Sequence, residues 1–127
     1  MGTRCLTFVY DGGVPVINVY RQFDGYPSIH GHELAQFLNS KTLVNGYTDK
    51  NSAEANGMGC LAAQLIVQLK RGVGGIYIYS VTSTDCGQDY EYHVYEDTVI
   101  VKDPTEVIFE GTWQEFAQFC LDPISAE

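Results

Sequence analysis

Residues 3–23, TRCLTFVYDGGVPVINVYRQF, contain two extended stretches separated by a pair of glycines. Side chains in residues 3–10 alternate between the two faces of a strand, with Leu6 and Phe8 on the same face. Residues 11–13, Asp-Gly-Gly, form a turn signal because glycine reaches positive φ without steric cost. We therefore expect a β-hairpin whose second strand covers residues 15–23.

The rest of the chain adds helices and further strands. Leucines at 61, 65 and 69 share one helical face, and Thr112 and Glu115 have the spacing of a capping box. Residues 41–57 are polar and are expected to form a loop. The expected helices are 30–39, with Ser28 as N-cap, 58–69 and 113–121; the expected strands are 76–81, 90–95, 98–102 and 106–109. This order predicts one α+β domain, residues 1–127, with a mostly antiparallel sheet of about five to six strands and two to three helices packed on one face.

Charge and cysteine content exclude several classes of protein. The formal net charge is −9, with 16 acidic and 7 basic residues, which argues against binding to nucleic-acid polymers and to anionic membranes. The four cysteines are far apart and form no Cys-x-x-Cys pair, so we expect free thiols in a cytosolic protein. The sequence shows no signal segment and no apolar run long enough to span a membrane.

The first candidate site follows the hairpin. Arg21, Asp24, Tyr26, His30 and His32 lie within twelve residues, across a strand end, a turn and a helix start. Such a junction can hold a phosphate or carboxylate ligand, with the arginine on the charge and the tyrosine on a ring. The alternative is structural: the aspartate caps the turn, the arginine pairs with a nearby carboxylate, and the tyrosine covers the edge of the core.

The second candidate is the start of the main helix, where Gly57, Met58 and Gly59 precede Cys60. Glycines there could let an anion approach free backbone N–H groups, and a cysteine at a helix N-terminus can be nucleophilic. The alternative is a tight helix entry with a packed thiol. Arg4 is a third candidate, since an arginine in an acidic protein needs either a carboxylate or a ligand as partner.

Other chemistry has less support in the sequence. His30 and His32 are spaced i, i+2, which fits no helical zinc motif, so we expect no metal and no cofactor. Catalytic serine motifs are absent, and we expect no catalytic residue. Tyrosines on alternating strand positions could line a ligand groove or a subunit interface, or simply pair across strands; they are Tyr77, Tyr79, Tyr90, Tyr92 and Tyr95.

Three segments together resemble small proteins encoded by tailed bacteriophages. They are Gly2-Thr3-Arg4, YRQFDGYP at residues 20–27, and the short helix that follows. The shared pattern covers about the first third of the chain, and residues 56–59 and 91–95 are similar to the same group. The resemblance implies a phage source and action in the host cytoplasm, but no particular activity.

These observations lead to three functional hypotheses. The first, by analogy with small phage proteins that act against bacterial defences, is an oligomeric protein that sequesters a phosphate-bearing nucleotide signal without cleaving it. Arg4, Arg21 and Tyr26 would then contact the ligand. The second is an acidic inhibitor or host-takeover factor that binds a basic host protein. The third is an enzyme that uses Cys60 or the two histidines, His30 and His32.

Overall fold

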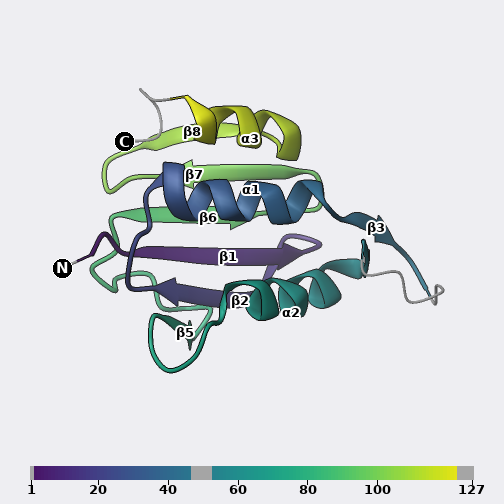
Figure 1. The fold of residues 1–127 in the computed structure, drawn as a ribbon, viewed down its shortest axis with the longest axis horizontal. Coiled ribbons are helices and arrows are strands. Elements are labelled where there is room, and N and C mark those ends of the chain that lie inside the picture. The colour runs from purple at the N-terminus through teal and green to yellow at the C-terminus, as the bar shows by residue number, and fades with distance from the viewer. Residues whose placement is uncertain (1, 47–52, 123–127) are drawn as a thin grey trace.

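The hairpin expected from residues 3–23 is present and lies at the centre of a six-stranded sheet (Figure 1). The computed structural model describes residues 2–46 and 53–122. The sheet order is β5-β2-β1-β6-β7-β8. These strands are β1 (Cys5–Asp11), β2 (Val14–Arg21), β5 (Ile76–Tyr79), β6 (Tyr90–Val94), β7 (Thr98–Lys102) and β8 (Val107–Thr112). All neighbours in this sheet are antiparallel except β1 and β6, which are parallel.

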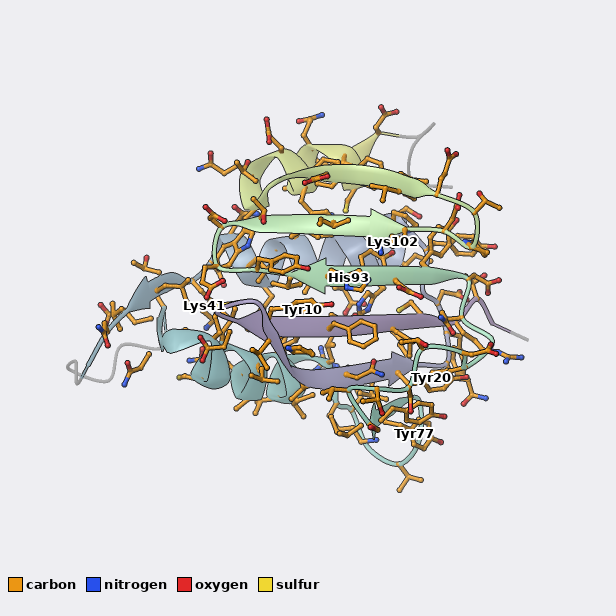
Figure 2. The ribbon with its side chains drawn as sticks, turned by 180° about the vertical axis from the view of Figure 1, so that it is seen from behind. Tyr10, Tyr20, Lys41, Tyr77, His93 and Lys102 are labelled. Atoms are coloured by element: carbon orange, nitrogen blue, oxygen red, sulfur yellow. The ribbon has the colours of Figure 1, made fainter. Side chains whose placement is uncertain are left out.

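Three α-helices cover one face of the sheet, and the other face is open (Figures 1 and 2). They are α1 (His32–Asn39), α2 (Gly57–Leu69) and α3 (Trp113–Leu121). The expected α+β class with a mostly antiparallel sheet is confirmed. The capping box is also confirmed: the Glu115 N–H donates to the Thr112 hydroxyl at 3.1 Å, and the Thr112 N–H donates to the Glu115 carboxylate at 2.8 Å.

Three local expectations were wrong. Residues 41–57 contain, besides loop, the short strands β3 (Thr42–Val44) and β4 (Glu54–Asn56), which pair in parallel; residues 47–52 lie outside the described part. The first helix begins at His32 instead of residue 30, because a π-helical turn, Pro27–Gly31, precedes it. No side chain caps either element, so the expected N-cap role of Ser28 is also wrong.

The alternation of β1 divides its side chains between two clusters. Cys5 and Val9 belong to the main core beneath the helices. Leu6 and Phe8 point to the open face, yet they are 0% and 3% exposed. They form a second cluster with Tyr20, against which Tyr10 and Cys86 pack. The open face is therefore aromatic at its centre, and the segment between β5 and β6 shields part of it.

The turn after β2 depends on close backbone approach at Gly25. Its N–H donates to the Thr3 carbonyl at 2.7 Å, and its carbonyl accepts from the Tyr92 hydroxyl at 2.7 Å. A Cβ at this position would lie 2.7 Å from the Cys5 Cβ. Glycine is therefore needed to hold the turn against both β1 and β6.

We predict that Gly25→Ala lowers the free energy of unfolding by about 2 kcal/mol or more, because the added methyl group overpacks a buried contact. Urea denaturation measures this change. Gly59→Ala is the matched control, since a Cβ there meets nothing within 4 Å. The control should be neutral or stabilising by up to about 1 kcal/mol, because alanine favours a helix more than glycine does. Equal stability of the two variants would contradict the packing argument.

Candidate functional site

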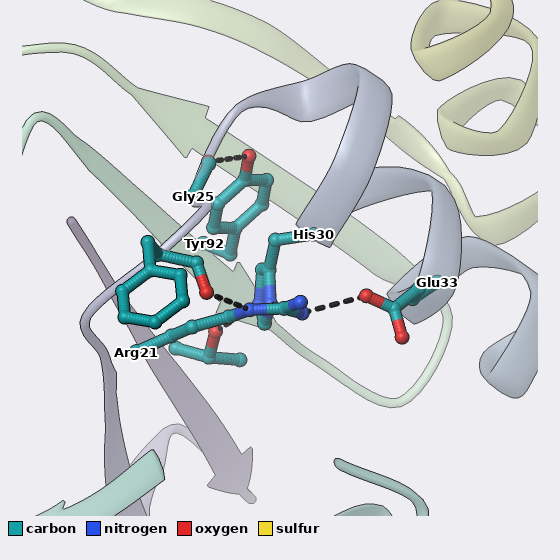
Figure 3. A network of polar contacts seen from close by, with 7 residues as sticks. Arg21, Gly25, His30, Glu33 and Tyr92 are labelled. Carbon is teal, nitrogen blue, oxygen red and sulfur yellow. Dashed lines mark hydrogen bonds and ion pairs between the residues drawn. The ribbon is translucent and has the colours of Figure 1, made fainter. Parts of the chain in front are cut away.

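Arg21 ends β2 on the helix-covered face, where three acceptors surround its guanidinium group (Figure 3). Nη1 donates to the Glu33 carboxylate at 2.7 Å and to His30 Nδ1 at 3.2 Å. Nε donates to the Phe23 carbonyl at 3.1 Å. The Arg21 side chain is only 16% exposed. Nε and Nη1 of Arg21 are thus directed to the protein's own groups, as in the structural alternative considered above.

His30 continues this chain of contacts into the core. Its side chain is fully buried, and Nε2 lies 2.7 Å from the Thr7 hydroxyl. A guanidinium group can only donate, so Nδ1 accepts from Arg21 and the ring proton is on Nε2, which donates to Thr7. Burial, and then the charge of Arg21, lower the pKa of His30 to about 3. The ring is therefore neutral at physiological pH.

The other residues of the first candidate set lie around the same corner in separate contacts. The Asp24 carboxylate accepts from the Thr3 N–H at 3.2 Å and so anchors the turn. Tyr26 is exposed, and its ring lies 6.0 Å from that of Tyr90. His32 begins α1 and is half-buried. These residues are close in space, but Arg21 and His30 form hydrogen bonds with other groups of the protein.

Arg4 and the start of α2 do not meet Arg21. Arg4 is exposed; its Nη1 lies 2.6 Å from the position that a Cβ on Gly87 would take, and its charge opposes the burial-driven rise in the pKa of Tyr20. Those contacts place it on the open face, opposite Arg21. The α2 start lies beside β4, at the other end of the sheet from the tip of β2 (Figure 1). There Gly57 has φ +81° and Met58 is only 2% exposed.

The open face holds a polar chain that the sequence analysis missed. His93 lies between Glu91, whose carboxylate is 3.0 Å from Nε2, and Tyr10, whose hydroxyl is 2.6 Å from Nδ1. The carboxylate can only accept, so Nε2 donates to Glu91 and Nδ1 accepts from the Tyr10 hydroxyl. Figure 2 shows Tyr10 and His93 on adjacent strands of this face. The alternation of Glu91, His93 and Tyr95 along one strand was a sequence signal for a shared face.

The protonation states of Tyr10 and His93 favour a role in holding side chains in place over a role as a nucleophile. Burial raises the pKa of Tyr10, and the neighbouring Tyr95 raises it further. Burial lowers the pKa of His93, although its hydrogen bond to Glu91 opposes this. Tyr10 is therefore a phenol and His93 a neutral imidazole near pH 7. Stacking of His93 on Phe8, at 5.0 Å between ring centroids, and of Tyr10 on Tyr95, at 4.4 Å, fixes the arrangement.

A groove of about 560 Å³ adjoins this chain at the end of the sheet where β6 begins and β7 ends. One wall is formed by residues 84–89 and the other by the β7–β8 turn, residues 103–106. Five carboxylates and a single ammonium group line it: Asp85, Asp89, Glu91, Asp103, Glu106 and Lys102. Hydrogen bonds from Thr105 and Glu106 hold the pKa of Asp103 below its ordinary value. The groove therefore has a formal charge of −4, one positive group against five negative ones.

Other chemistry finds little support in the described part of the chain. No group of three or more His, Cys, Asp or Glu residues there could hold a metal ion. Cys5, Cys60, Cys86 and Cys120 are free thiols, and burial raises the pKa of Cys120 to about 12. Cys60 is half-buried in the first turn of α2. None of the helices in residues 2–46 and 53–122 is long and apolar enough to cross a membrane.

Comparison with known proteins gives no family: no family model, no curated protein and no solved structure matches this chain. The function must therefore be inferred from the geometry above.

We predict that the unfolding free energy falls by about 2 kcal/mol between pH 7 and pH 5 because of His30. In the unfolded chain the imidazole binds a proton below pH of about 6.5, whereas in the folded protein its pKa is about 3. The unfolded state thus gains protons over this window and the folded state does not, so stability is lost as the pH falls. Imidazole NMR shifts provide the direct measurement: the His30 ring should stay neutral, with its proton on Nε2. A midpoint near pH 6 for this ring would be incompatible with the assignment.

We predict that Arg21→Gln lowers the unfolding free energy by about 2 kcal/mol, mainly because it leaves the buried His30 without its donor, whereas the partly exposed Glu33 can be hydrated. Arg4→Gln, at an exposed side chain, should change it by less than about 0.5 kcal/mol. Thermal or urea denaturation of both variants separates a structural arginine from one available to a ligand. A stable Arg21→Gln protein would argue against the structural role.

Proposed function

We propose that the protein is a non-catalytic, acidic binding protein that captures a basic segment of a partner protein. The observation that carries this proposal is the groove between residues 84–89 and 103–106, with its five carboxylates and one ammonium group. The proposal agrees with the chain's net charge of −9. If the chain is phage-encoded, as the resemblance implies, the partner is a host protein and the role is that of an inhibitor or host-takeover factor.

The groove suits lysine and arginine side chains in volume and lining as well as in charge. Its volume of about 560 Å³ lies within the range of sites that enclose small groups. Tyr90, Pro104 and Val107 contribute apolar lining beside the carboxylates. Basic side chains bury their aliphatic stems on such surfaces while the charged end reaches an acceptor. Opposite potentials on the two partners would speed their encounter and favour a basic sequence over an acidic one.

The hypothesis of a phosphate-bearing nucleotide ligand has weaker geometric support. Nε and Nη1 of Arg21 already donate to Phe23, His30 and Glu33, and a phosphate there would lie beside the Glu33 carboxylate, which repels it. The groove itself repels an anion. Among the described residues, the exposed Arg4 and Arg71 have no carboxylate within ion-pair distance, and of these two Arg4 belongs to the predicted ligand set. Nucleotide capture therefore stays a prediction, which titration with cyclic dinucleotides and ADP-ribose derivatives would test.

We predict that the protein binds an eight-residue peptide of alternating arginine and glycine, and not the matching glutamate–glycine peptide. Isothermal titration at low and high salt measures this difference. Replacing two exposed groove carboxylates, in Asp85→Asn/Glu106→Gln, should weaken binding by about tenfold at low salt, because two attractive charges are lost in a confined site. Affinity should also fall as salt is raised.

The control pair is Asp11→Asn/Asp97→Asn, which removes the same charge from exposed positions outside the groove. It should weaken peptide binding by less than about twofold, because exposed charges beyond a Debye length are largely screened. Equal losses in the two double variants would mean that the peptide responds only to net charge. Absence of binding at high micromolar peptide would reject the basic-segment proposal, and binding of a nucleotide instead would favour the alternative.

A further inference from the structure

The strand β5 is an edge of the sheet, and no described strand covers its outer side. On its inner side it pairs with β2. Three of its four side chains are exposed although they are large and mostly apolar: Tyr77 is 44%, Ile78 59% and Tyr79 37% exposed. Exposed edges of this composition are templates for pairing with another strand.

The features that usually prevent an edge strand from pairing with another molecule are almost absent in β5. Natural edges carry charges, proline or bulges that block pairing. Residues 72–84, which include β5, contain no charged residue and no proline, in a chain of net charge −9. Lys70 covers the first half of the strand: its ammonium group donates to the carbonyls of Gly74 and Ile76 at 3.1 and 2.8 Å and lies 5.6 Å from the centroid of the Tyr77 ring. By contrast β8, at the opposite edge, includes Glu110 and follows Glu106.

We propose that β5 is a self-association strand, which pairs antiparallel with β5 of a second copy of this chain about a two-fold axis. The occupant is a second copy for an electrostatic reason. Two molecules of charge −9 repel each other, and the neutral segment 72–84 is a surface where they can approach without opposing carboxylates. Isologous pairing of one strand with itself also needs no other complementary partner.

The register of this pairing follows from the faces of the sheet. Directly opposite residues in an antiparallel pair project to the same face of the sheet. A two-fold axis normal to the sheet leaves each face unchanged. One residue of β5 must therefore lie directly opposite its own copy, and the axis passes between these two residues. Lys70 occupies the Ile76 carbonyl, which disfavours an axis at Tyr77. An axis at Ile78 places Ile78 opposite its copy on the helix-covered side. It also places Tyr77 opposite the Tyr79 of the other molecule on the open face, extending an aromatic row that includes Tyr20, stacked on Tyr79 at 4.8 Å.

The test introduces a charge at Ile78, positive in one variant and negative in another. Sedimentation equilibrium over a concentration series then measures dimer formation. The wild-type chain should form dimers. Ile78→Lys and Ile78→Glu should each raise the dimer dissociation constant by about tenfold or more, because like charges then meet across the axis. A one-to-one mixture of the two variants should restore dimers, since an ammonium group then faces a carboxylate. Ile78 is exposed and outside the buried core, so both variants should keep the monomer fold.

Val107→Lys is the matched control, because Val107 is 49% exposed on the other edge strand. It should leave the dimer dissociation constant within about twofold of wild type. A wild-type chain that stays monomeric at high micromolar concentration would overturn the proposal. So would dimers that tolerate both single substitutions, or that are lost equally with Val107→Lys. Failure of the mixture to restore dimers would reject the axis at Ile78.

Discussion

The corner between β2 and α1 depends on a series of hydrogen bonds that runs from the partly exposed Glu33 through Arg21 and the buried His30 to Thr7. An arginine can enter the edge of a core only if its charge and its donors are matched there. The neutral imidazole supplies an acceptor on one side and a donor on the other, so both ring nitrogens of His30 are paired. A second anchor, from Tyr92 to the Gly25 carbonyl, ties the same corner to β6.

This internal use of Arg21 decides where binding chemistry can lie. The helix-covered side is filled by the main core and the corner, and Tyr92, with 0% exposure, completes it. The contacts among Glu91, His93 and Tyr10 lie on the open face, and the acidic groove lies at the end of the sheet. There the chain Glu91–His93–Tyr10 fixes the floor beside the acidic groove. The segment YRQFDGYP was expected from the sequence to bind a ligand. In the structure, its Arg21 and Gly25 connect β2 to α1 and to β6 through hydrogen bonds.

Local patterns in the sequence were sufficient for the hairpin, the main helix and the capping box at Thr112. Local patterns could not predict the strand order, because β1 and β6 pair in parallel although their residues are more than 80 positions apart in the sequence. The same limit applies to the sites. The local sequence around Arg21 is compatible with both a ligand-binding role and a structural role. Only the positions of Thr7 and Glu33 in the fold distinguish these two roles. Likewise, the shared face of Glu91 and His93 was readable, but their partner Tyr10 comes from another strand.

The distribution of charge connects the groove with the neutral edge. A surface acidic enough to attract a basic segment also repels further copies of the same chain, so association between copies requires a segment without carboxylates. Residues 72–84 meet this condition, and none of the six charged groove residues lies within them. Pairing at β5 would leave both grooves open and hold them on one continuous sheet. Two linked sites raise the effective concentration for a partner with two basic segments, without any new contact within either groove.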